Sequence, residues 1–182
     1  MLLIGSKASP YVRKIRLQLG QEVYKFLVVD IFSYEGKQIV QKYSPCLRIP
    51  VLVDEKTTIW DSYLIAQYLE DKTFDLETKK NLFLINEMTD AGIQLYQLRK
   101  FHLDESDTSV FSQNNLTRIK NILSYFDQMS LEWNLLGRWV FCTLDWFLYR
   151  DIYDFRNDFI HLNHFYQQSQ NEKYVQETDP RL

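Results

Sequence analysis

The sequence predicts an α/β domain followed by an all-α domain, and two observations support this prediction. From Met1 to about Leu69, short apolar runs suited to strands alternate with helix-like segments. Beyond the run EDKTFD, apolar residues recur at three- and four-residue spacing, which is typical of packed helices. We therefore expect one domain over residues 1–73 and a helical domain over residues 74–182, sizes that a chain of 182 residues accommodates.

The first domain is expected to run in the order βαβαββα. Its strands are predicted at the short apolar runs LLIG, YKFLVV, PVLVD and TTIW. Helices are predicted from Pro10 to Gly20, near Glu35 to Lys42, and from Asp61 onward. Proline suits the first helical position, where the N–H it lacks would be unbonded in any case, and this places Ser9 at the N-cap.

The second domain is expected to contain helices and no strand after Phe74. Four segments carry helical spacing: LFLINEMTDAGIQLYQLRKF, NLTRIKNILSYFDQMSLEW, LLGRWVFCTLDWFLYRDIYDF and NDFIHLNHFYQQSQ. Aromatic residues make up 15% of the chain and gather in this half. They either form the core or line an apolar pocket.

Composition excludes several classes of function. A net charge of −3 argues against nucleic acid or an anionic membrane as the main partner, because phosphate binding needs clustered positive charge. No long apolar window or secretion signal is visible, so we expect a soluble, cytoplasmic protein. The two cysteines lie far apart and the three histidines are scattered, so we expect reduced thiols and no metal site.

The stretch Ser9-Pro10-Tyr11-Val12 places a hydroxyl at the start of a helix. Unpaired N–H groups and the positive end of the helix dipole meet there, which suits an anion. Two interpretations remain open: Ser9 caps its own helix, or it binds an anionic ligand.

Two further positions invite the same pair of interpretations. At Ile49-Pro50 a proline enters a strand, and with a cis bond the backbone N–H and C=O of Ile49 would point outward to pair with an extended peptide. At Asp61-Ser62 another helix opens. Asp61 is either a simple N-cap or the acceptor for a ligand ammonium, while Ser62 binds a ligand carboxylate through its N–H and hydroxyl.

Together these residues resemble the glutathione transferase superfamily, nearest its bacterial members. Residues 9–14, SPYVRK, look like the family's segment of the same letters, and SPCLRIPVL is similar to its NPxGKVPVL stretch, with Pro50 at the cis-proline. WDSYLIAQYLED resembles its (E/D)S…I…YL helix, and TDAG, CTLDWFLYR and YVQETDP look like weaker motifs of its second half. The resemblance implies a thioredoxin-like N-terminal domain, a helical glutathione-transferase C-terminal domain, and a homodimer.

The resemblance also implies glutathione as co-substrate and a role for each site residue. Ser9 takes the place where CPYC relatives keep a nucleophilic cysteine, so the thiol arrives with the ligand and Ser9 stabilises it as thiolate. Arg48, Ile49 and Pro50 lie along the glycyl and cysteinyl units, and Asp61 and Ser62 hold the γ-glutamyl group. A small electrophile is expected in a pocket built from these residues: Tyr11, Tyr96 and Arg99.

Departures from the family pattern keep a second function open. Where relatives often open a central helix with Thr or Ser followed by Asp, this chain offers Asn134 and Gly137, and the spacers around the helices are short. The first hypothesis is an enzyme that uses the glutathione thiolate against an electrophile. The alternative is a non-catalytic interaction protein of the stringent starvation protein A type, and retention on immobilised glutathione discriminates between them.

Overall fold

The chain folds into two compact units, seen in a computed structural model that describes residues 1–71, 73–104 and 106–182. The first unit contains Met1–Phe74 together with Asn171–Leu182, and the second contains Asp75–Gln170. The sequence had placed residues 171–182 in the helical domain. They belong instead to the first unit, because Val175, Glu177 and Thr178 accept hydrogen bonds from arginines of its first helix.

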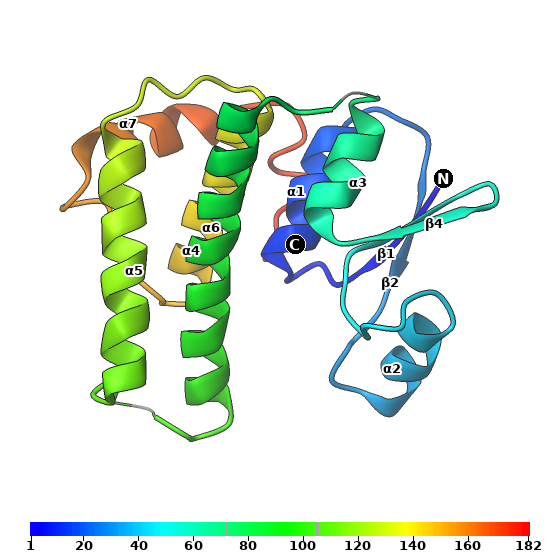
Figure 1. The fold of residues 1–182 in the computed structure, drawn as a ribbon, viewed down its shortest axis with the longest axis horizontal. Coiled ribbons are helices and arrows are strands. Elements are labelled where there is room, and N and C mark those ends of the chain that lie inside the picture. Colours follow the sequence, from blue (N-terminus) through cyan, green and yellow to red (C-terminus); the bar gives the residue numbers. More distant parts are fainter. Residues whose placement is uncertain (72, 105) are drawn as a thin grey trace. The chain divides into compact units, whose positions relative to one another are not determined.

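The first unit has the predicted order βαβαββα (Figure 1). Its sheet has the order β2-β1-β3-β4, with β1 parallel to β2 and antiparallel to β3, and β3 antiparallel to β4. The strands are β1 Leu2–Gly5, β2 Lys25–Val28, β3 Val51–Asp54 and β4 Thr57–Trp60. The helices are α1 Pro10–Leu19, α2 Tyr34–Gln41 and α3 Ser62–Leu69.

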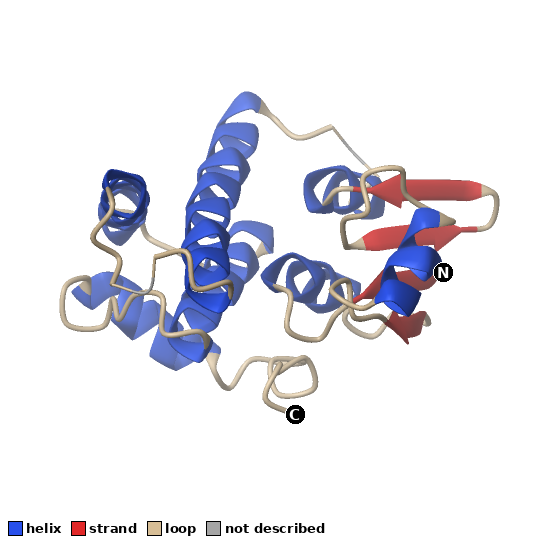
Figure 2. Ribbon diagram, turned by 90° about the horizontal axis from the view of Figure 1, so that it is seen from below, coloured by secondary structure: helices blue, strands red, loops and turns tan. Residues whose placement is uncertain are grey.

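Helices cover both faces of this sheet (Figure 2). Ile4 of β1 and Val51 of β3 lie opposite each other and pack with Val40 of α2 in one core cluster. Leu3 and Leu52 are the adjacent pair in the register and are fully buried, and side chains alternate along a strand, so they face α1 and α3. The layout of one mixed sheet between helices is thioredoxin-like.

Gly5 sets how closely β1 approaches α1. A Cβ atom placed on this residue would lie 2.5 Å from Cγ2 of Val12 and 2.8 Å from its Cγ1. Real Cβ atoms do not come this near to a neighbour, so a larger residue would displace the strand end or the helix. The tight contact fixes the geometry of the turn between them, which carries Ser9.

The second unit consists of helices, and no strand follows Phe74 in the part of the chain that the structure describes. The helices are α4 Leu76–Lys100, α5 Val110–Asp127, α6 Leu135–Tyr149 and α7 Ile160–Ser169. α4 and α5 begin earlier than the sequence pattern suggested, because polar side chains cap them ahead of the apolar runs. Asp75 accepts the N–H of Thr78 at 2.7 Å and Ser109 accepts that of Ser112 at 3.1 Å.

The start of α6 confirms the predicted pair Asn134 and Gly137. Oδ1 of Asn134 accepts the N–H of Gly137 at 3.1 Å, which makes Asn134 the N-cap. A Cβ atom on Gly137 would lie 1.9 Å from the carbonyl oxygen of Glu132, so the incoming chain needs glycine at this position.

Buried polar pairs link the helices of this unit. Thr89 of α4 and Thr143 of α6 share a hydrogen bond of 2.9 Å, and Tyr166 of α7 donates to Asp145 of α6 at 2.7 Å. No helix among the described residues is long and apolar enough to cross a membrane.

Candidate functional site

The register of the sheet brings the predicted glutathione residues to one end of it. Ile4 of β1 and Trp60 of β4 both lie opposite Val51, the first residue of β3. The chain leaves β1 and β4 at this end and enters β3 there. The turn to Ser9, the loop through residues 48–50 and the start of α3 therefore lie at the same edge of the first unit (Figure 1).

Ser9 is the N-cap of α1, as the sequence predicted. Its Oγ accepts the N–H of Val12 at 3.4 Å, and its backbone is extended with φ −83° and ψ 125°. A serine hydroxyl has two acceptor sites and one hydrogen to donate. Accepting the capping bond therefore leaves the Ser9 hydrogen free to point at an anion.

The first turns of α1 supply positive potential at Ser9. The first turn holds no acidic residue, and Arg13 and Lys14 follow directly, with exposed fractions of 3% and 0%. The unbonded N–H groups of a helix start add to this potential. A thiol placed there is stabilised as thiolate, which lowers its pKa.

The loop before β3 presents unbonded backbone. The Ile49–Pro50 bond is cis, as predicted. Among the described residues nothing bonds the N–H or C=O of Ile49, which is half-buried, while Arg48 beside it is exposed. Paired N–H and C=O groups that point out of a fold bind an extended peptide in the manner of an added strand.

The start of α3 presents polar groups that bond no described residue. Oδ1 of Asp61 accepts the N–H groups of Tyr63 at 2.9 Å and Leu64 at 3.2 Å. Ser62 is 2% exposed, yet neither its N–H nor its hydroxyl bonds any described residue, and Oδ2 of Asp61 is also unbonded within that set. The two donors of Ser62 suit an anion at a helix start, and Oδ2 suits a cation.

Asp61 holds an unusual backbone conformation at this position, with φ 78° and ψ 129°. A residue with a Cβ atom adopts positive φ at a cost of about 1–3 kcal/mol. The residue in this conformation is the one that caps α3 and directly precedes Ser62.

The three residues predicted to line the electrophile pocket fall in both units. Tyr11 of α1 is half-buried, with the Lys14 ammonium 4.7 Å from its ring centroid. Tyr96 of α4 packs edge-on against Trp146 at 6.0 Å, and the Arg150 guanidinium lies 4.9 Å from the Tyr96 ring. The sequence held no signal for this last contact, since α4 and the end of α6 are far apart in the chain.

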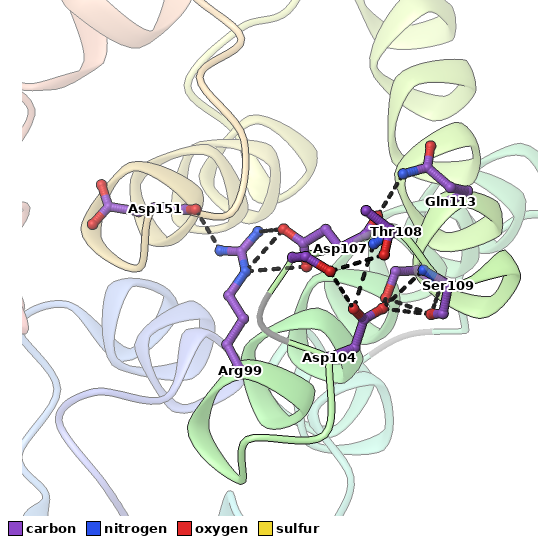
Figure 3. Close-up of polar contacts among 9 residues, drawn as sticks. Arg99, Asp104, Asp107, Thr108, Ser109, Gln113 and Asp151 are labelled. Carbon is purple, nitrogen blue, oxygen red and sulfur yellow. Dashed lines mark hydrogen bonds and ion pairs between the residues drawn. The ribbon is translucent and has the colours of Figure 1, made fainter.

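Arg99 is bound within the second unit (Figure 3). Its Nε donates to Asp107 Oδ1 at 3.2 Å and its Nη2 to Oδ2 at 2.5 Å, while Nη1 donates to the Asp151 carbonyl at 2.6 Å. These bonds give Arg99 a structural role that the sequence did not suggest. Its role in a substrate pocket stays a prediction, as do those of Tyr11 and Tyr96.

A second polar cluster, also missed from the sequence, opens α5. Asp104 accepts the hydroxyls of Ser109 at 2.5 Å and Ser112 at 2.6 Å, and the N–H of Ser109 at 3.1 Å. These hydrogen bonds, first that of the Ser109 hydroxyl and then that of Ser112, hold the pKa of the Asp104 carboxyl well below its usual range. Among the described residues no group of three or more histidines, cysteines or acidic residues is arranged to hold a metal ion.

Comparison with known proteins identifies the first unit. Residues 3–75 match the family model described as the glutathione S-transferase N-terminal domain. The Escherichia coli GST-like protein YibF, which is uncharacterised, is 31% identical over 105 residues, and this match spans 51% of this chain and 52% of YibF. The chain thus matches about half the length of this curated relative.

Solved structures share the fold along nearly the whole chain. A glutathione S-transferase from Methylobacillus flagellatus with glutathione bound has a TM-score of 0.84 at 20% identity and covers 98% of both chains. A glutathione transferase family member from Pseudomonas fluorescens Pf-5 with bound glutathione has a TM-score of 0.86 at 18% identity, covering 100% of this chain and 99% of its own. The first unit therefore matches the glutathione S-transferase N-terminal domain, and the chain shares the fold of the solved glutathione S-transferases along nearly its whole length.

Proposed function

We propose that this protein binds glutathione in its first unit and activates the glutathione thiol, through Ser9, for attack on a small electrophile. The observation that carries the proposal is the convergence, at one end of the sheet, of the Ser9 hydroxyl with the unbonded groups of Ile49 and Ser62. A single hydroxyl at a helix start is adequately explained as a cap. Several unbonded groups that match a peptide and its charged ends, gathered at one end of the sheet, are explained better by a ligand than by capping alone.

Each part of glutathione has a partner of matching chemistry. The γ-glutamyl carboxylate binds the N–H and hydroxyl of Ser62, and its ammonium binds Asp61. The cysteinyl unit pairs with the backbone of Ile49, ahead of Pro50, and the glycyl carboxylate lies toward the Arg48 guanidinium. This binding mode delivers the sulfur to the start of α1.

Ser9 then acts on the thiol. The thiol loses its proton to solvent, and the Ser9 hydroxyl donates a hydrogen bond to the thiolate that remains. The thiolate attacks the electrophilic carbon, a C–S bond forms, and the leaving group departs with the bonding electrons. The thiol comes with the co-substrate, so this reaction requires no metal and no cysteine of the protein.

In the first unit, the electrophile is proposed to contact Tyr11. The aromatic face of Tyr11 suits an apolar or aromatic body. Solved relatives with glutathione bound support glutathione as the co-substrate here.

We also propose that two copies of the chain associate. Trp60, Leu64 and Tyr68 expose 39%, 50% and 43% of their surface on β4 and α3 of the first unit. Leu64 and Tyr68 are one helical turn apart, so they share a face that a second copy would cover. Light scattering is expected to show a dimer for the wild type and a monomer for Leu64→Glu, whereas a monomeric wild type contradicts this proposal.

Calorimetric titration of the protein with glutathione, followed by an assay with an activated aryl halide, tests the main proposal. We expect binding and turnover for the wild type, and loss of both in the Asp61→Asn/Ser62→Ala double variant. Absence of glutathione binding contradicts the proposal. Binding without turnover against a broad set of electrophiles favours the non-catalytic interaction protein instead.

A further inference from the structure

Residues 174–182 run antiparallel to α1 along the surface of the first unit. The Tyr174 ring lies against Gly20, just beyond the helix, where a Cβ atom would come within 3.1 Å of the ring. Nearer the helix start, Arg16 Nη2 donates to the Glu177 carbonyl at 2.8 Å, and Lys7 Nζ lies 3.5 Å from the Leu182 carbonyl. The segment therefore follows α1 from its end back to the turn that carries Ser9.

Arg13 makes the most deeply buried contact in this arrangement. Its Nε donates to Thr178 Oγ1 at 3.3 Å and its Nη2 to the Val175 carbonyl at 3.1 Å. The exposed fractions are 3% for Arg13, 3% for Thr178 and 5% for Val175, so these bonds are shielded from water. Hydrogen bonds from a charged group in a buried setting are stronger than neutral ones, and a lost partner leaves the charge uncompensated.

Thr178 is itself fixed in place. Its hydroxyl donates to the Tyr174 carbonyl at 2.8 Å while it accepts from Arg13, so both functions of the hydroxyl are used. A valine at this position keeps the shape but loses both bonds, whereas a serine keeps both.

Arg13 is joined directly to Ser9. Its backbone N–H donates to the Ser9 carbonyl at 3.1 Å, in the first turn of the helix. Within the turn before Ser9, the Ser9 N–H donates to the Ser6 carbonyl at 3.2 Å and the Ala8 N–H to Ser6 Oγ at 3.3 Å. The position of the Ser9 hydroxyl therefore depends on how firmly the first turn of α1 is anchored.

We propose that Arg13 is a positioning residue for the thiolate site and that residues 174–182 are its anchor. By binding Thr178 and Val175, Arg13 fixes the first turn of α1 and so aims the Ser9 hydroxyl at the glutathione sulfur. This inference rests on the proposed role of Ser9. Hydrogen bonds to a thiolate depend steeply on geometry, and displacement by about 1 Å from a remote change can lower a rate up to a hundredfold.

The test compares Thr178→Val with Thr178→Ser in the full chain, at a temperature where both are folded by circular dichroism. For Thr178→Val we expect turnover to fall about tenfold and the pKa of the bound glutathione thiol to rise, with glutathione affinity changed less than about twofold. Thr178→Ser is expected to restore wild-type values. If Thr178→Val does not fold, Arg13→Lys replaces it, because lysine keeps the charge but does not provide two donors in a planar fork.

A lowered melting temperature with unchanged turnover and unchanged thiol pKa overturns the proposal, since the segment then stabilises the unit without positioning Ser9. Absence of glutathione binding in the wild type overturns the proposed function itself. The two failures are therefore distinguishable.

Discussion

Arg99 and Asp107 form a two-pronged ion pair within the second unit, with Nη2 2.5 Å from Oδ2 and Nε 3.2 Å from Oδ1 (Figure 3). The third donor of Arg99 binds the Asp151 carbonyl, just beyond α6, at 2.6 Å. One guanidinium thus links the end of α4, the turn into α5 and the end of α6. The side chains of the pair are 27% and 21% exposed, so solvent weakens the pair less than an open surface pair.

We predict that Arg99→Met and Asp107→Asn each lower the free energy of unfolding by about 1–2 kcal/mol. The double variant is expected to lose less than the sum, because the two residues are coupled by about 1 kcal/mol. Urea denaturation of the wild type, the two single variants and the double variant measures this coupling energy. If the two single losses add up to the loss in the double variant, the interaction between Arg99 and Asp107 does not stabilise the fold.

The order of elements was predictable because local patterns encode it. Strand-length apolar runs, the proline after Ser9 and the helical spacing after Phe74 all depend on neighbours in the chain, and the structure agrees with them. Helix starts were less accurate, since the pattern of apolar residues does not show that Asp75 or Ser109 caps a helix several residues earlier.

Contacts between distant parts of the chain were not predictable in this way. The sequence contains RK after SPYV and YVQETDP near residue 175, but nothing local pairs Arg13 with Thr178 across 165 positions. The binding of Arg99 to Asp107 was missed for a related reason, because the sequence around an arginine on a helix does not indicate which carboxylate it will bind. The candidate positions Ile49 and Ser62 were indicated by local signals, a proline that enters a strand and the start of a helix, and the family resemblance implied their roles. Their unbonded groups became visible in the three-dimensional structure.

Gly5→Ala is predicted to destabilise the first unit by about 1–3 kcal/mol, because its Cβ atom would collide with Val12. The double variant Gly5→Ala/Val12→Ala removes the methyl groups that collide with the new Cβ atom. Its loss of stability is therefore expected to be smaller than the sum of the losses in the two single variants. Thermal or urea unfolding measures both. If the loss of stability in the double variant equals the sum of the two single losses, the Val12 side chain does not restrict the size of residue 5.

The stability of the protein is predicted to fall in acid partly through Asp104. Its pKa is lowered in the folded state by the Ser109 and Ser112 hydroxyls, so its contribution is present above the unfolded pKa of about 3.9 and declines as pH falls below it. Asp104→Asn should lower the melting temperature at neutral pH, and its difference from the wild type should begin to shrink below pH about 3.9 and continue to shrink toward the lower, folded-state pKa. Glu22→Gln, at an exposed carboxylate with no hydrogen bond to a described residue, is the matched control. A constant gap between wild type and Asp104→Asn across this range would contradict the prediction.

Ser62→Ala is predicted to weaken glutathione binding by about 1.5–3 kcal/mol, since it removes a hydroxyl from a charged contact. Asp61 keeps its capping bonds in this variant, so the fold is expected to survive. Isothermal titration measures the affinity, and Thr57→Ala serves as control because Thr57 lies at the opposite end of the β3–β4 hairpin. Equal glutathione affinities for Ser62→Ala and the wild type would show that the Ser62 hydroxyl does not contribute to glutathione binding.

The pKa of glutathione's thiol, measured in complex with the wild type and with Ser9→Ala, tests the central claim most directly. Ser9→Ala removes the hydroxyl that we propose donates to the thiolate, and Ser9→Thr keeps both this donor and the cap. One hydrogen bond to an anion corresponds to a pKa change of about one to two units, and loss of such a donor lowers turnover by about a hundredfold. Ultraviolet titration of the bound thiolate should therefore show a higher thiol pKa in Ser9→Ala, a wild-type value in Ser9→Thr, and similar glutathione affinity in all three proteins. An identical thiol pKa in wild type and Ser9→Ala would contradict the account, because Ser9 would then be a helix cap and nothing more.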